Sequence, residues 1–127
     1  MKIRIKGNSL RYRLTRSDVD LLATNGKVRE SVHFGNASLQ YELETTAASK
    51  LSAVFSNNCI TVYFPAAWID NWIHADAVGF KQVMEIEGDA GGLYLAVEKD
   101  FTCLDNVSED QSDNYPNPLM KKKYEHK

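Results

Sequence analysis

Two stretches of this sequence, fifty residues apart, show the same succession of a strand, a helix and a second strand. Residues 10–14 alternate apolar and basic side chains, as a strand with one buried face does, and lead into a helix predicted over Thr15–Gly26. Residues 60–64 form a similar strand-like run, and Pro65 then suits the first turn of a helix that extends to Asp76. A fixed period of this size indicates an internal structural repeat.

The apolar positions of the two predicted helices repeat at the same offset. They are Val19 and Leu22 in the first helix and Ile69 and Trp72 in the second. We therefore predict that residues 10–56 and 60–104 superpose as related halves. In the second helix Trp68 joins Trp72 on the apolar face, so both tryptophans are expected to be at least partly buried against the sheet.

Most of the remaining chain predicts short strands joined by tight turns. Alternating apolar and polar side chains, separated by turn signals such as Gly35-Asn36 and Asn57-Asn58, are typical of antiparallel hairpins. Together with the two short helices, this pattern predicts an α+β fold. We expect mostly antiparallel strands in a compact, barrel-like sheet with pseudo-twofold symmetry from the duplication. A chain of 127 residues, 43% of them hydrophobic, is large enough for one such core.

Composition predicts a single domain over residues 1–118. After Leu104 the chain becomes polar and contains prolines, and residues 119–127 carry a run of three lysines that predicts a disordered basic tail. The N-terminus alternates charged and aliphatic residues, so it resembles neither a signal peptide nor a membrane span. The two cysteines are most simply buried thiols of a cytoplasmic protein, and we expect that localisation.

Long motifs at both ends of the chain resemble a small bacterial domain family of unknown function. The N-terminal motif is MKIRIKGNSLRYRLT, and the C-terminal motif combines EKDFTCL with EDQSDNYPNP. The resemblance extends from Met1 to about Pro118, which implies that the polar C-terminal stretch belongs to the domain. It implies no activity, cofactor or site residue.

The residues with the most reactive side chains lack the spacing of a known catalytic or metal site. The three histidines are far apart, and the two cysteines do not form a Cys-x-x-Cys pair. Surface or hydrogen-bonded histidines and packed thiols are the favoured interpretation, so we predict no catalytic set and no metal site, with the cofactor unknown. The residues predicted to bind a ligand, if the chain has a ligand pocket, are Arg11, Tyr12, Arg13, His33 and Cys103.

Before Asp18 the chain contains six basic residues and no acidic residue. The basic residues are Lys2, Arg4, Lys6, Arg11, Arg13 and Arg16. In alternating strands these side chains lie on outward faces, which favours an ordinary solvated sheet surface. The alternative is a binding surface for an anionic ligand or an acidic protein partner, with Tyr12 between the arginines available for stacking.

The densest group of acidic residues follows the last predicted strand. Asp105, Glu109, Asp110 and Asp113 lie within residues 104–115. Such a loop is usually only solvated, and chelation of a hard cation is the alternative, although the ligand spacing and central glycine of a calcium loop are absent. We expect this segment to fold back near the basic N-terminal strands. Burial of the Tyr115 ring, more than the carboxylates, should hold it there.

These patterns favour a non-enzymatic binding or assembly module that forms a homo-oligomer through sheet edges or an apolar face. The alternative is a small-ligand-binding protein or enzyme with a polar pocket between the two pseudo-symmetric halves. A net charge of −2 argues against a nucleic-acid partner, and we expect no membrane partner.

Overall fold

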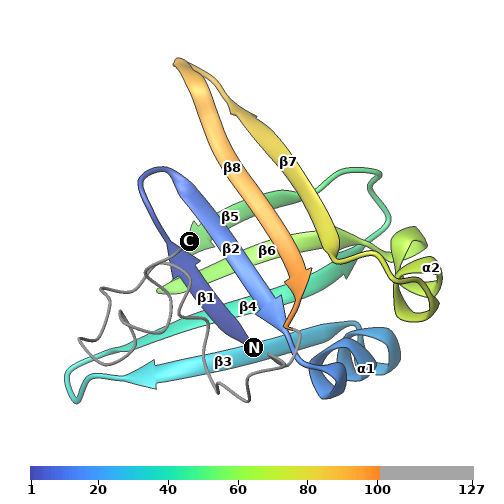
Figure 1. The fold of residues 1–127 in the computed structure, drawn as a ribbon. Coiled ribbons are helices and arrows are strands. Elements are labelled where there is room, and N and C mark those ends of the chain that lie inside the picture. The colour runs from blue at the N-terminus through green and yellow to red at the C-terminus, as the bar shows by residue number, and fades with distance from the viewer. Residues whose placement is uncertain (101–127) are drawn as a thin grey trace, which may run out of the picture.

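The computed structural model describes residues 1–100 and confirms the predicted α+β class (Figure 1). The strands are β1 (Lys2–Ile5), β2 (Ser9–Leu14), β3 (Lys27–His33), β4 (Ser38–Thr46), β5 (Ser52–Ser56), β6 (Cys59–Pro65), β7 (Gly79–Ile86) and β8 (Asp89–Lys99). The helices are α1 (Arg16–Asn25), a short 3-10 helix η1 (Ala66–Trp68) and α2 (Ile69–His74). Strands therefore dominate the described chain, with two short α-helices between them.

The strands form two separate four-stranded sheets. The first sheet has the order β1-β2-β8-β7, and the second has the order β3-β4-β6-β5. In Figure 1 the strands of the two sheets run in different directions, and one sheet lies over the other. Within residues 1–100 no strand pairing joins the sheets, so the barrel-like closure predicted from the sequence is not confirmed.

Each sheet is mixed, because two antiparallel hairpins meet in a central parallel pair. Strand β2 runs parallel to β8, and β4 runs parallel to β6. The other four pairings are antiparallel and join strands that are consecutive in the chain. Turn residues predict such hairpins, whereas a parallel pair joins distant strands without a local turn signal. The sequence therefore predicted hairpins such as those at Gly35-Asn36 and Asn57-Asn58, but not the way the hairpins assemble.

The first helix begins and ends where the sequence predicts. The Thr15 hydroxyl accepts a hydrogen bond from the Asp18 N–H, and the Asp18 carboxylate accepts one from the Thr15 N–H at 2.9 Å, which completes a capping box. Gly26 ends the helix in the left-handed conformation with φ of 76°. Asn57 and Asn58 also have positive φ values, as the predicted two-residue hairpin requires.

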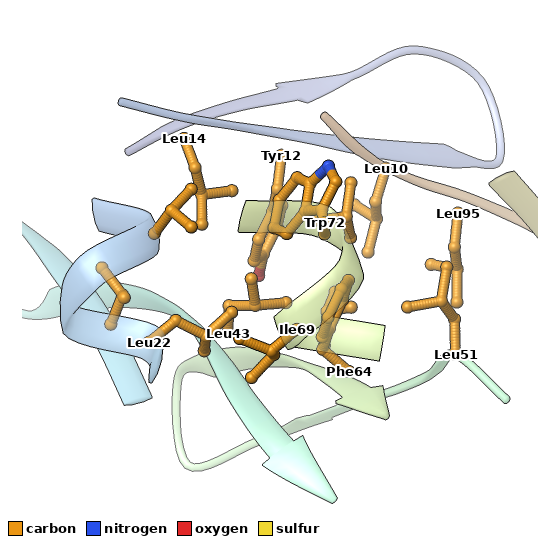
Figure 2. Packing of buried hydrophobic residues seen from close by; sticks show 14 residues of the cluster. Leu10, Tyr12, Leu14, Leu22, Leu43, Leu51, Phe64, Ile69, Trp72 and Leu95 are labelled. Carbon is orange, nitrogen blue, oxygen red and sulfur yellow. The ribbon is translucent and has the colours of Figure 1, made fainter. Parts of the chain in front are cut away.

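Apolar side chains from both sheets and both helices fill the space between the sheets (Figure 2). Leu22 of α1 and Trp72 of α2 are both fully buried there. The Trp72 ring packs on Phe64 with ring centroids 5.2 Å apart, and the partly buried Trp68 stacks on Phe80 at 4.5 Å. The prediction that both tryptophans are at least partly buried is confirmed.

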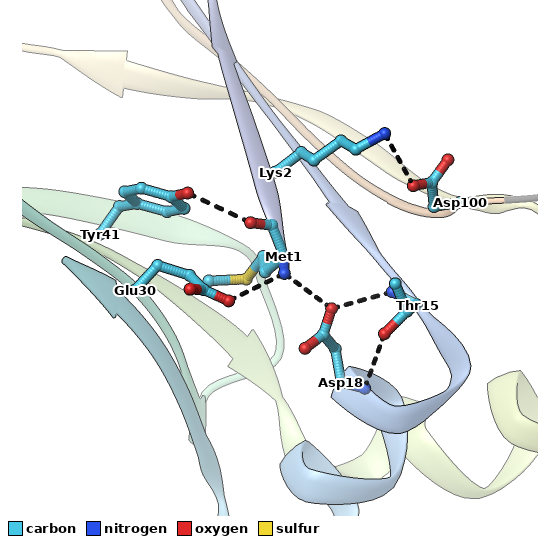
Figure 3. A network of polar contacts seen from close by, with 7 residues as sticks. All are labelled: Met1, Lys2, Thr15, Asp18, Glu30, Tyr41 and Asp100. Atoms are coloured by element: carbon cyan, nitrogen blue, oxygen red, sulfur yellow. Dashed lines mark hydrogen bonds and ion pairs between the residues drawn. The ribbon is translucent and has the colours of Figure 1, made fainter. Parts of the chain in front are cut away.

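The N-terminal amino group lies in a polar network that ties β1 to α1 and to the second sheet (Figure 3). The Met1 ammonium is 2.9 Å from Asp18 and 3.0 Å from Glu30, and the Tyr41 hydroxyl donates to the Met1 carbonyl at 3.2 Å. Burial alone would lower the pKa of the ammonium, but hydrogen bonds to the two carboxylates raise it. Burial alone would raise the pKa of Asp18, but hydrogen bonds from the Met1 ammonium and from Thr15 lower it.

We expect Asp18→Asn to lower the free energy of unfolding by about 1–3 kcal/mol at neutral pH, because it leaves a buried ammonium with one carboxylate fewer. Urea denaturation measures this loss, and Asp20→Asn on the exposed side of α1 is the control. Because the folded-state pKa of Asp18 is lowered, its contribution is present above the unfolded pKa near 3.8 and is lost as the pH falls through the folded pKa. The difference in unfolding free energy between Asp18→Asn and wild type should therefore shrink in acid. A difference that stays constant down to pH values below both the folded-state and the unfolded-state pKa of Asp18 would contradict the ion pair.

Candidate functional site

Arg11 and Arg13 lie together on the outer face of the first sheet, on either side of Glu98. The apolar residues of β2 point into the core, so the two arginines that alternate with them point outward. Arg11 Nη1 is 3.2 Å from each carboxylate oxygen of Glu98, and Arg13 Nε is 3.7 Å from one of them. The Glu98 side chain is only 9% exposed. A carboxylate between two guanidinium groups holds both arginines in place.

Strand register arranges the charged residues of this face in two rows across the sheet. In one row Lys2 and Arg13 lie beside Glu98. The other row contains Arg4, Arg11, Ala96 and Lys81. Directly paired residues of neighbouring strands point to the same side of a sheet. We call the resulting surface the basic face, and its cations are Lys2, Arg4, Arg11, Arg13 and Lys81.

The sequence predicted only part of the basic face. Lys6 lies beyond the end of β1 and Arg16 lies in the first turn of α1, so neither belongs to the two rows. Lys81 and Glu98 come from the second half of the chain, and they reach this face only because β8 pairs with β2. No local pattern in the sequence indicates that parallel pairing.

One end of the basic face lies where the chain leaves β8. The Lys2 ammonium is 3.4 Å from the Asp100 carboxylate. The Asp100 N–H donates to the Leu14 carbonyl at 2.8 Å. Both contacts fix residue 100 beside the row that contains Lys2 and Arg13 (Figure 3).

Tyr12 lies on the opposite side of β2 from the arginines. Its side chain is fully buried, and its hydroxyl donates to the Ile60 carbonyl of the second sheet at 3.0 Å. The ring meets Tyr41 edge to face at 6.2 Å, and burial raises the pKa of the hydroxyl. Tyr12 therefore bridges the two sheets, and its ring has no exposed surface on which a ligand could stack.

Of the two remaining predicted ligand residues, the structure describes only His33, which does not lie on the basic face. His33 lies at the exposed end of β3 in the second sheet, where its Nδ1 is 2.8 Å from the Ser38 hydroxyl. Cys103 lies outside the described residues, as do the acidic segment 105–113 and the predicted tail 119–127. The described members of the predicted set thus occupy three different places: the outer face of the first sheet, the core and the end of β3.

A second polar cluster, which the sequence analysis missed, lies on the outer face of the second sheet. Glu42 is buried and accepts hydrogen bonds from Arg29 Nε at 2.8 Å and from the Thr61 hydroxyl at 2.9 Å. The Cys59 sulfur is 3.6 Å from the Thr61 hydroxyl. Burial alone would raise the pKa of Glu42, but the hydrogen bonds from Arg29 and Thr61 lower it. Because both carboxylate oxygens are engaged, the cluster stabilises the sheet surface.

Part of this cluster had a signal in the sequence. Counting outward from the Gly35-Asn36 turn pairs Arg29 with Glu42 across the hairpin, and the structure has this register. The contact between Glu42 and Thr61 crosses a parallel pair, for which the sequence has no such signal.

Residues 1–119 match the model of a family of unknown function, DUF7009. The chain belongs to the DUF7009 family. This confirms the resemblance to an uncharacterised family that the terminal motifs indicated. Searches of curated proteins and of solved structures gave no match. Any function of this DUF7009 protein has to be inferred from the site itself.

Two further observations on this DUF7009 chain concern residues 1–100. In that range no three histidine, cysteine, aspartate or glutamate side chains are grouped so that they could hold a metal ion. The helices there are too short or too polar to cross a bilayer.

Proposed function

We propose that this DUF7009 protein is a non-enzymatic binding or assembly module of the cytoplasm that recognises an acidic protein segment through the basic face. The observation that carries this proposal is the register that places five cations on one face of the first sheet, with Glu98 between two of them. Arg11 and Arg13 are already restrained by Glu98, so they lose less conformational entropy when they bind another carboxylate. Guanidinium groups also suit carboxylates geometrically.

The spread of the cations favours an extended acidic segment over a small anion. They lie on β1, β2 and β7, and β7 is three strand spacings from β1. At about 4.8 Å per spacing this distance is roughly 14 Å, the length of several residues of extended chain. A small anion would reach only two or three of the cations at once.

The alternative of a ligand pocket or active site between the two halves has no specific observation in its favour. Among the described residues, apolar side chains fill the space between the sheets. An open depression is present at the tip of the β7–β8 hairpin, lined by residues such as Val83, Ile86 and Asp89. Its lining also includes Glu85 and Glu87, and within residues 1–100 no three such carboxylates are grouped so that they could hold a metal ion.

Self-association remains part of the proposal. The sheets end in the edge strands β1, β7, β3 and β5, and a strand edge can pair with another chain. Phe34 and Phe55 are 65% and 68% exposed near the hairpin ends of the second sheet. Light scattering after size-exclusion chromatography measures whether copies associate through these surfaces.

We also infer that the fold is an internal duplication. Residues 2–46 and 52–99 each have the order hairpin, helix, hairpin, and each sheet joins one hairpin from each of these halves. These bounds differ from the predicted 10–56 and 60–104, because β1 pairs with β2 and β5 pairs with β6. In the parallel pairs, Ser9 of β2 lies opposite Tyr94, and Cys59 of β6 lies opposite Gln40. Ser9 and Cys59, the first paired residues of β2 and β6, are fifty positions apart, which is the period of the sequence repeat. Superposing the two halves of an experimental structure tests this inference. Helices in unrelated positions would contradict it.

Charge reversal tests the proposed binding surface. We expect a short glutamate homopeptide to bind at low salt, and Arg4→Glu with Lys81→Glu to weaken that binding by roughly tenfold or more, since each altered ion pair contributes up to about 1 kcal/mol. The control reverses two exposed charges elsewhere, Arg16→Glu with Lys50→Glu. Fluorescence anisotropy measures the affinities. Equal weakening in both double variants would show that net charge, and not the basic face, determines binding.

A further inference from the structure

We propose that an acidic segment of the chain itself, residues 105–113, occupies the basic face and competes there with an external partner. The inference rests on the proposed function of this face and names its first occupant. The segment lies outside the described residues, and its occupancy of the face is inferred from the point where the described chain ends and from charge.

The last described residue lies at the edge of the basic face. Asp100 is held by the Leu14 carbonyl and forms an ion pair with Lys2. Asp105 follows five residues later, so at about 3.3 Å per residue it can reach roughly 17 Å from Asp100. That reach is similar to the width of the face from β1 to β7. The segment can therefore contact the cations without any rearrangement of the sheets.

The charges of the segment and of the face are complementary. Residues 101–120 contain four acidic residues and no lysine, arginine or histidine. The face has five cations, with Glu98 between two of them. A linker of only a few residues gives a tethered segment an effective concentration in the millimolar range. Contacts that would be weak between separate molecules are therefore sufficient to fill the face within one chain.

Neutralising the segment in the full-length chain tests its position directly. The variant carries Asp105→Asn, Glu109→Gln, Asp110→Asn and Asp113→Asn, and two-dimensional NMR of the backbone amides compares it with wild type. We expect shift changes at the basic face, around Arg4, Arg11 and Glu98. The control Asp70→Asn with Asp76→Asn should leave those signals in place. Unchanged signals on β1, β2 and β8 in the neutralised variant would overturn the inference.

The same two proteins separate this inference from the proposed function. If the segment competes, the neutralised variant should bind the glutamate homopeptide roughly tenfold more tightly than wild type. Equal affinity with unchanged amide signals would overturn the inference and leave the basic face as a binding surface. Absence of binding by either protein would overturn the proposed function, while the amide signals still decide whether the segment contacts the face. Shift changes that appear only at high protein concentration would show that the segment binds the basic face of a second copy. This result would overturn the inference that the segment occupies the face of its own chain.

Discussion

Replacing Trp72 with alanine is expected to lower the free energy of unfolding by about 3–5 kcal/mol. The side chain is 1% exposed, and its ring packs on Phe64 at 5.2 Å and on Phe80 at 5.7 Å between centroids. The Lys99 ammonium also lies 5.8 Å from the ring centroid. A loss of this size is a large part of the stability of a small domain, so thermal unfolding should shift down by many degrees.

Two other variants make this prediction specific. Phe55→Ala removes an aromatic ring that is 68% exposed, so it should change the melting temperature little. Trp72→Phe should cost much less than Trp72→Ala, because the Trp72 Nε1 has no hydrogen-bond partner within the described residues and phenylalanine removes that unsatisfied donor. Similar melting temperatures for Trp72→Ala and Phe55→Ala would contradict the central position of Trp72 in the core.

Gly79→Ala is expected to destabilise the first sheet by about 1–3 kcal/mol, because a side chain at this position has no room. A Cβ at residue 79 would lie 2.7 Å from the Cα of Glu98 and closer still to the Val97 carbonyl oxygen. Both are backbone atoms of β8, so they cannot rotate away, and β7 would have to move from its partner strand. Chemical denaturation measures the cost.

Gly91→Ala in the same hairpin is the matched control for Gly79→Ala. A Cβ there would be 3.6 Å from Asp89 Oδ1, which is an ordinary contact, and neither glycine requires a positive φ. Because β8 carries Glu98, Gly79→Ala should also weaken binding of the glutamate homopeptide. Equal stability of the two variants would show that β7 and β8 do not approach as closely as the structure indicates.

The features that the sequence predicted correctly depend on neighbouring residues. Thr15 and Asp18 cap a helix within one turn, and Asn57-Asn58 closes a hairpin of consecutive strands. The separation into two sheets depends instead on parallel pairs between β2 and β8 and between β4 and β6. Such pairs are determined by packing across the whole chain, and no turn residue between the paired strands indicates them.

In the candidate site too, the features that depend on neighbouring residues were predicted and those that depend on long-range pairing were not. Arg11 and Arg13 were predicted from the alternation in β2, and the same alternation places Tyr12 on the core side, where its ring is buried. Stacking by Tyr12 was therefore inconsistent with the period of two that predicted the arginines. Lys81 and Glu98 were missed because their place beside the arginines depends on the long-range register.

The most direct test of the basic face is an NMR titration of the full-length, segment-neutralised chain with the glutamate homopeptide. We expect saturable amide shifts at Arg4, Arg11, Ala96 and Lys81, which are neighbours across three strand pairings, and we expect high salt to abolish these shifts. Signals of the second sheet around Glu42 should not move. Shifts confined to the second sheet, or no shifts at saturating peptide, would contradict the assignment of this face as the binding surface.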